Sequence, residues 1–190
     1  MRLNLGCGNN HIKGWLNVDI RPGPAVDFVC DLTKKLVWQD DSVDEIYMSH
    51  VLEHIQNPLP LMQELYRVAK PGTYCFVRVP HGSHDMAHSD PTHKSIWFED
   101  SFMFLQQPYY WRADYDYTAD WQVEIVTYSM QHGLEEESAS ALHEMIFRKR
   151  NFVREMLARL VKVCPARARN RKLICHTRRT IDFEGGGASG

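Results

Sequence analysis

The stretch LNLGCGNNHIKGWLNVDI, residues 3–20, decides the fold. One apolar run ends in Gly6-Cys7-Gly8, and a second ends in Asp19. Glycines directly after a strand let the backbone turn tightly and let its N–H groups approach a ligand closely. We therefore predict two strands joined by a ligand-binding turn. The connection is too short for the full crossover helix that usually joins parallel strands.

The residues after this turn disfavour two common ligands. A phosphate-binding P-loop closes with Lys followed by Ser or Thr, whereas Asn9-Asn10-His11 stands here. A dinucleotide site requires a third glycine and an acidic residue about 20 positions further on. His11 occupies the glycine position and Asp19 comes too early, so a ligand without phosphate fits better.

Apolar runs near 2–5, 15–20, 26–30, 44–49 and 73–79, with a helical pattern over 59–72, predict an α/β fold with a mostly parallel sheet. Ligands of such sheets bind at the carboxyl ends of the strands, where Asp19 and Asp31 would lie. Asp19 is suited to accept from the two hydroxyls of a ribose. Asp31 is suited to accept from an exocyclic adenine amine.

The second half of the chain is less regular. We interpret 82–120, rich in His, Asp, Pro and aromatic residues, as a loop or lid over an acceptor. Residues 121–131 and 172–183 are expected to form an antiparallel pair of late strands, and 184–190 a flexible tail. Between them, 135–163 is interpreted as one long helix with a basic end. Its apolar stripe, which favours core packing or a homodimer, is Phe152, Val153, Met156, Leu157, Leu160 and Val161.

Composition and charge narrow the class of protein. The 190 residues predict one domain, and no apolar run approaches the roughly 20 residues of a membrane span. Five cysteines without metal-type pairing favour a reducing, cytoplasmic setting. Residues 1–147 hold 10 Lys/Arg and 21 Asp/Glu, whereas 148–190 hold 12 and 3. Part of this charge is a basic cluster of Arg167, Arg169, Arg171 and Lys172. The cluster would either bind an anionic partner weakly, a membrane surface or a nucleic acid, or form a solvated basic face.

Histidines supply the candidate catalytic groups. The segment HVLEH, 50–54, matches a zinc peptidase pattern, but Pro58 ends the helix too soon, so Glu53 and His54 are better interpreted as fixing the loop by hydrogen bonds. Donors suited to Zn, Fe or Mn crowd the next loop: His81, His84, His88, Asp90 and His93. Loop ordering and general-base catalysis are the alternatives there. We assign no metal ligand and name His81 and His93 as candidate bases.

Aromatic residues between 97 and 111 have two interpretations. They would either wall an acceptor pocket or pack the underside of the lid on the sheet. We expect packing to explain most of them and one or two to face the acceptor. The residues are Trp97, Phe98, Phe102, Phe104, Tyr109, Tyr110 and Trp111.

Five short motifs occur in order: LNLGCGNN, NVDI, CDL, SVDEIYMSHVLEHI and ELYRVAKPGTYCFVRVPH. Together, over about residues 2–81, they resemble the class I S-adenosylmethionine-dependent methyltransferases, in particular a small type-11-like branch with a Leu-Glu-His signature after the fourth strand. The chain departs from that pattern in lacking a first helix and in having Asn where many relatives have a third glycine.

The resemblance implies a Rossmann-like sheet, mostly parallel with an antiparallel C-terminal strand pair, and S-adenosylmethionine as cofactor. It places the methionine part of the cofactor on Leu5, Gly6, Cys7 and Gly8. It places the ribose on Asp19 and Ile20, the adenine on Asp31 and Leu32, and the methyl-donor side on Ser49 and His50. Residues 1–81 would then be the cofactor-binding half, and 121–183 would hold the late strands and the inserted helix.

The function expected from these residues is methyl transfer to a small-molecule or sugar acceptor. A module that binds S-adenosylmethionine without catalysis and docks on an anionic partner is the alternative. A metal-dependent hydrolase that uses the histidine-rich loop is the third hypothesis.

Overall fold

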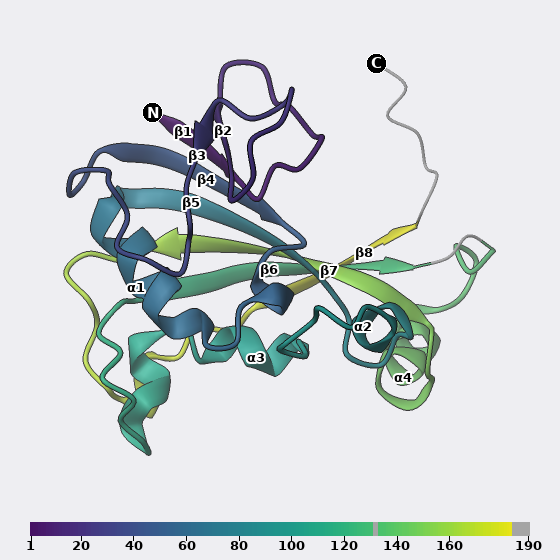
Figure 1. Cartoon of the computed structure of the whole chain (residues 1–190). Helices are drawn as coiled ribbons and strands as arrows, with labels where there is room; N and C mark the ends of the chain where they lie inside the picture. Colours follow the sequence, from purple (N-terminus) through teal and green to yellow (C-terminus); the bar gives the residue numbers. More distant parts are fainter. Residues whose placement is uncertain (131–132, 184–190) are drawn as a thin grey trace.

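The computed structural model describes residues 1–130 and 133–183, so the predicted tail lies outside the described residues. Figure 1 shows one twisted sheet with strand order β3-β2-β1-β4-β5-β7-β6-β8. The strands are β1 (Arg2–Leu5), β2 (Leu16–Asp19), β3 (Phe28–Val29), β4 (Val43–Ser49), β5 (Ala69–Pro80), β6 (Trp121–Met130), β7 (Val153–Lys162) and β8 (Arg178–Phe183). The helices are α1 (Pro58–Val68), α2 (Met86–Ser89), α3 (Glu99–Met103) and α4 (Ala139–Arg148), with short 3-10 turns η1 (Leu52–His54), η2 (Gln107–Trp111) and η3 (Arg171–Leu173).

The sheet topology confirms the predicted fold class. Strands β1 to β5 pair in parallel, and β1 lies between β2 and β4. The chain therefore changes direction across the sheet at β1, and this switch point is where open α/β sheets bind their ligands. No helix lies between β1 and β2 in the described residues, as the short connection predicted.

The long helix predicted over 135–163 is wrong. The segment forms α4, a turn through Asn151 with φ of 58°, and then β7, which is antiparallel to both β5 and β6. From Met156 to Lys162 every second residue of β7 is buried, and Leu157 and Val161 on the other face are half-buried. An inner strand with apolar residues on both faces produces adjacent apolar pairs, and these resemble a helical stripe.

The two late strands also differ from the prediction in detail. Of the predicted strand over 121–131, residues 121–130 form β6 and residue 131 lies outside the described residues. Only the second half of 172–183 forms a strand, β8. These two strands pair with each other in parallel, and the antiparallel strand is β7.

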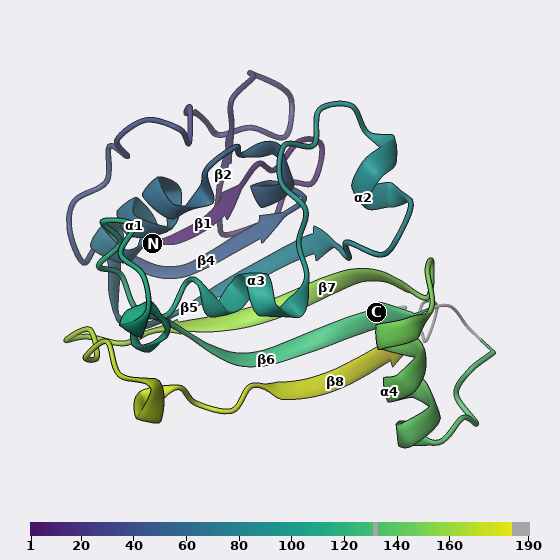
Figure 2. The same ribbon diagram turned by 90° about the horizontal axis from the view of Figure 1, so that it is seen from below.

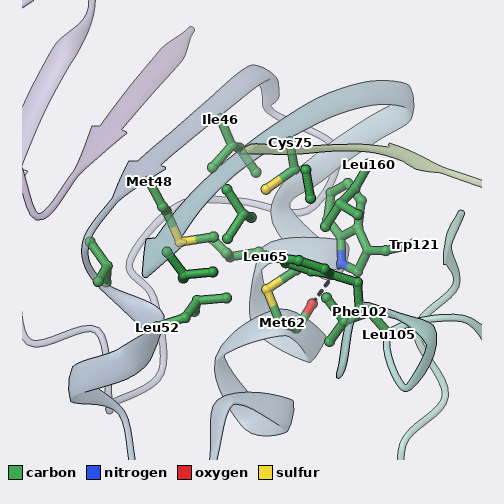
Figure 3. Close-up of a cluster of buried hydrophobic side chains, with 14 of the residues drawn as sticks. Ile46, Met48, Leu52, Met62, Leu65, Cys75, Phe102, Leu105, Trp121 and Leu160 are labelled. Carbon is green, nitrogen blue, oxygen red and sulfur yellow. Dashed lines mark hydrogen bonds between the residues drawn. The ribbon is translucent and has the colours of Figure 1, made fainter. Parts of the chain in front are cut away.

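The core lies between the sheet and the helices α1 and α3, which cover the same face (Figures 1 and 2). Helix α1 begins at Pro58, where the Asn57 side chain accepts from Leu59 N at 3.2 Å. In Figure 3 the side chains of the sheet meet those of α1 and of the following segments, and Trp121 Nε1 donates to the Met62 carbonyl at 3.0 Å. The labelled residues are Ile46, Met48, Leu52, Met62, Leu65, Cys75, Phe102, Leu105, Trp121 and Leu160.

Acidic groups of the body pair with many of the basic residues near the C-terminus. Arg167 bonds Asp120, a fully buried carboxylate, through Nη2 at 2.7 Å and Nε at 2.8 Å. Similar ion pairs join Arg159 to Glu124, Lys162 to Asp41, Arg169 to Asp114 and Arg179 to Glu99. The charge asymmetry of the sequence is thus largely satisfied inside the molecule, and the predicted basic helix for an anionic partner does not exist.

We expect Asp120→Ala to lower the free energy of unfolding by about 3 kcal/mol or more, because it leaves the Arg167 guanidinium without its buried partner. Urea unfolding of the purified variant measures this loss. The control Asp182→Ala removes an exposed carboxylate on β8 and should change stability by about 0.5 kcal/mol or less. Equal losses in the two variants would contradict a special role for Asp120.

Candidate active site at the carboxyl ends of the strands

The turn after β1 leaves space for a ligand beside Gly8 but not beside Gly6. Gly6 and Gly8 have φ of 63° and 51°, a conformation that favours glycine. A Cβ on Gly6 would lie 2.3 Å from Val51 Cγ2, so no side chain fits there. A Cβ on Gly8 would meet nothing within 4 Å. The space beside Gly8 is therefore available to a ligand, whereas Val51 closes the space beside Gly6.

Two carboxylates stand next to this turn. Asp19 accepts from Gly8 N at 2.9 Å and from Arg21 N at 3.1 Å, which fixes its orientation at the end of β2. Asp31 accepts from the hydroxyl and the N–H of Thr33, and these hydrogen bonds lower the pKa of its carboxyl. Beside them, Ile20 is 61% exposed. Hydrogen-bond acceptors and an uncovered apolar side chain are the groups that a nucleoside requires.

His50 stands at the tip of β4 in a strained conformation with φ of 56°. Its N–H donates to the Arg78 carbonyl, and its ring lies between Glu53, at 3.0 Å from Nδ1, and Glu155, at 3.2 Å from Nε2. Hydrogen bonds to Glu155 and then to Glu53 raise the pKa of His50 to about 9, against the effect of burial. His50 is therefore a cation at neutral pH.

Glu155 on β7 completes this cluster. Burial alone would raise its pKa, but the hydrogen bond from His50 and the charge of Arg78, whose Nη1 lies 2.7 Å away, lower it. No pattern in the sequence indicates Glu155, because its segment resembles a helix and only the register of β7 places this residue beside β5 and the tip of β4.

All ten residues predicted to hold the cofactor lie at or just beyond the carboxyl ends of β1 to β4. The side chains of Leu5 and Leu32 are buried, so these two residues would reach a ligand through backbone atoms. The predicted contacts are Leu5, Gly6, Cys7, Gly8, Asp19, Ile20, Asp31, Leu32, Ser49 and His50.

The segment HVLEH does not form a peptidase helix, because only the three residues of η1 are helical. The Glu53 carbonyl instead accepts from Lys94 N at 2.7 Å and from Ser95 N at 3.1 Å. His54 Nδ1 lies 3.0 Å from Thr92 Oγ1. The prediction that Glu53 and His54 fix the loop by hydrogen bonds is confirmed.

His81 follows β5 and is 5% exposed. Burial, and to a smaller degree the charge of His84, lower its pKa to about 4. Ser83 N donates to its Nδ1 at 3.3 Å, so the neutral ring carries its proton on Nε2. His93 lies elsewhere, with its ring centroid 4.9 Å from that of His54.

A cavity of about 400 Å³ opens beside His81. Tyr128, near the end of β6, donates its hydroxyl to Glu99, which in turn pairs with Arg179 at 2.8 Å. The wall consists of His81, Ser83, Phe98, Glu99, Asp100, Tyr128, Ile146, Phe147 and Arg179. Its size and its mixture of rings and charges suit a small polar molecule.

Of the aromatic residues between 97 and 111, Phe98 lines this cavity, and its ring centroid lies 5.3 Å from that of His81. Trp97, Phe102 and Tyr110 are buried, as packing on the sheet predicted. Phe104 and Trp111 are 40% exposed and line a second cavity, near η3.

Comparison with known proteins agrees with this geometry. The sequence profile of a family described as methyltransferase domain matches residues 3–77. A SAM-dependent methyltransferase from Archaeoglobus fulgidus has a TM-score of 0.61 at 17% identity, over 85% of each chain. A SAM-dependent methyltransferase from Methanosarcina mazei has a TM-score of 0.51 at 15% identity, over 85% of this chain and 92% of that chain. A chain from the Haloferax volcanii complex that contains the Trm112 methyltransferase activator has a TM-score of 0.55 at 16% identity. The match covers 85% of this chain and 82% of that chain. No curated protein sequence matches.

The described chain thus has the fold of the class I S-adenosylmethionine-dependent methyltransferases, and residues 3–77 carry the sequence pattern of their methyltransferase domain. The resemblance to these methyltransferases is confirmed over residues 3–77, and the Leu-Glu-His signature stays a prediction. The names of two of these solved structures describe S-adenosylmethionine-dependent methyltransferases, in agreement with the predicted cofactor. Among the described residues, no helix combines the length and the apolar character that crossing a membrane requires.

The carboxylates around His50 lead to a prediction of the pKa of this ring and of the pH dependence of stability. We expect its ring protons, followed by NMR, to titrate with a pKa of about 9. Because the folded value lies above the ordinary value of about 6.5, the folded state holds an extra proton between these two pH values. The stability from His50 is therefore complete below about pH 6.5 and lost as the pH rises through 9.

Glu155→Gln provides the control, since it removes the largest cause of the shift and should move the midpoint of His50 downward. A wild-type midpoint near 6.5 would show that the two carboxylates do not hold the ring as described.

Proposed function

We propose that the chain transfers the methyl group of S-adenosylmethionine to a small polar acceptor that binds beside His81. One observation carries this proposal. The carboxyl ends of β1 to β4 hold the predicted cofactor residues, and the cavity beside His81 lies at the ends of β5 and β6, along the same edge of the sheet. Cofactor and acceptor would then meet next to the tip of β4.

In the cofactor half, Asp19 would accept from the ribose hydroxyls while the glycine turn lets the backbone approach the methionine part. Both roles agree with the open space beside Gly8 and with the fixed orientation of the Asp19 carboxylate. Asp31 would accept from the adenine amine, with Ile20 against the ring.

The transfer itself needs alignment more than acid or base strength, because the sulfonium carbon is already activated. An electron pair on the acceptor forms the new bond to the methyl carbon while the bond from carbon to sulfur breaks. The sulfonium becomes a neutral thioether, and an acceptor hydroxyl or amine loses a proton to a base. A site that holds both partners in line and excludes water supplies most of the acceleration.

His81 is the proposed base, because His50 is already protonated at neutral pH. His93, the other predicted candidate, lies against His54 and does not line this cavity. Burial keeps His81 neutral at that pH. In the geometry described, its proton-free nitrogen, Nδ1, faces Ser83. His81 would therefore accept a proton only after exchange of its ring tautomer, whereas its Nε2–H is suited to donate to an acceptor oxygen.

The cofactor assignment is tested by calorimetric titration with S-adenosylmethionine. We expect Gly8→Ala and Asp19→Ala to weaken binding by about 10- to 100-fold, which corresponds to about 1–3 kcal/mol. Gly72→Ala is the matched control, since Gly72 also has positive φ and open space around its Cβ but lies at the other end of β5. It should share the backbone strain of Gly8→Ala and leave binding unchanged.

Absence of binding by the wild type would remove the basis for the methyltransferase proposal. Binding without transfer to any member of a broad acceptor panel would favour the alternative, a module that binds the cofactor without catalysis.

The acceptor cavity is tested by Asp100→Tyr, which places a ring at an exposed position of its wall. We expect methyl transfer from labelled S-adenosylmethionine to fall at least tenfold, because the acceptor loses its space. Binding of the cofactor, measured by calorimetry, should stay the same. Asp182→Tyr on β8 is the control, and full activity in Asp100→Tyr would place the acceptor elsewhere.

A further inference from the structure

Glu53 has a carboxylate oxygen that the rest of the site does not use. The side chain is 2% exposed, and its Oε1 is engaged by His50. Its Oε2 is buried and has no hydrogen-bond partner. A buried carboxylate oxygen left without a partner carries a considerable free-energy cost, so the position calls for a cation or a donor that completes it.

Two histidines stand next to this oxygen. Glu53, His54 and His93 each offer one ligand atom, and these atoms lie within 4.8 Å of one another. The two rings meet edge to face with centroids 4.9 Å apart, and the His93 side chain is only 10% exposed. His54 comes from η1 and His93 from the loop after α2, so the fold brings together residues far apart in the chain.

The hydrogen bonds around the rings leave one nitrogen of each without a proton. His93 Nδ1 faces the Ala87 carbonyl at 3.1 Å, and a carbonyl only accepts, so Nδ1 carries the proton. Thr92 donates its one hydroxyl proton to Asp90 at 2.6 Å, so its oxygen accepts from His54 Nδ1. In both rings the lone pair is therefore on Nε2. His93 Nε2 lies 3.8 Å from Asp90 Oδ2, which is longer than a hydrogen bond, so this nitrogen is left for a metal.

The hydrogen bonds of His54 and His93 are those usual for metal-binding histidines. In such residues the second ring nitrogen donates to a carbonyl or to an acceptor that is itself hydrogen-bonded. Two imidazoles and one carboxylate suit a first-row transition ion such as Zn²⁺ or Fe²⁺, whereas Mg²⁺ and Ca²⁺ prefer oxygen ligands alone. We propose that Glu53, His54 and His93 bind one divalent transition-metal ion.

The proposal is independent of the methyltransferase proposal. The ion would join η1 to the loop over 90–95, which already donates two N–H groups to the Glu53 carbonyl. Three protein ligands also leave coordination positions open for water or for an acceptor oxygen. Through Glu53, the ion would be linked to His50 at the tip of β4.

The experiment uses the purified full chain after treatment with a chelator. Calorimetry with Zn²⁺ should give one ion per chain, and Co²⁺ should give the visible absorption of a site with nitrogen ligands. Thermal unfolding should shift upward with Zn²⁺ because the ion binds the folded state. Mg²⁺ should produce none of these effects.

Variants assign the ligands. His54→Ala, His93→Ala and Glu53→Gln should each abolish the Co²⁺ spectrum. Thr92→Val, at an exposed position, should weaken Zn²⁺ binding by about 10- to 100-fold, the usual cost of removing a group that orients a ligand. His143→Ala, exposed on α4, should bind as the wild type does. Variants that keep the circular dichroism spectrum of the wild type and unfold cooperatively in urea are folded, so their loss of metal is specific.

Absence of Zn²⁺ binding by the wild type would overturn the proposal. So would unchanged binding in folded His54→Ala and His93→Ala. Neither result would affect the calorimetric test of S-adenosylmethionine, so failure of the metal site and failure of the proposed function are distinguishable.

Discussion

The hydrogen bonds of Glu53 connect the parts of the proposed site. Its Oε1 holds the His50 ring at the tip of β4, and its carbonyl accepts from Lys94 N and Ser95 N in the long loop. The residue is nearly completely buried. A charged group in that position must be paired, so its neighbours are restricted to cations and donors. The loop beyond β5 is therefore held against the cofactor edge by one carboxylate and its backbone.

The pairing of charges across the chain is the second organising feature. A basic C-terminal part suggested an anionic partner, but the partners observed for its inner residues are carboxylates of the same molecule. Asp120 and Arg167 show why this matters, because the guanidinium binds both oxygens of a fully buried carboxylate and so compensates the cost of its burial. Charge asymmetry along a sequence therefore indicates an outside partner only if the fold does not bring the two halves together.

The residues of the proposed site lie along the edge of the sheet where the parallel strands end. Parallel strands place all their carboxyl ends on one side, so residues from β1 to β4 meet there whatever their distance along the chain. The antiparallel strand β7 enters this edge from the opposite direction and brings Glu155 to His50. The cation at the tip of β4 thus depends on a strand near the other end of the chain.

The sequence by itself determined the first five strands, helix α1, the reduced first crossover and the positions of the predicted cofactor residues. It could do so because a strand, a glycine turn and a terminal carboxylate are local patterns, and a helical pattern before the fifth strand indicates a parallel crossover. Only the tertiary structure decided that 153–162 is a strand, since apolar residues on both faces of an inner strand resemble a helical stripe. It alone brought Glu155 to His50, Asp120 to Arg167, and His93 to Glu53 and His54. These contacts join residues far apart in the chain, and no spacing in a single sequence records such distances.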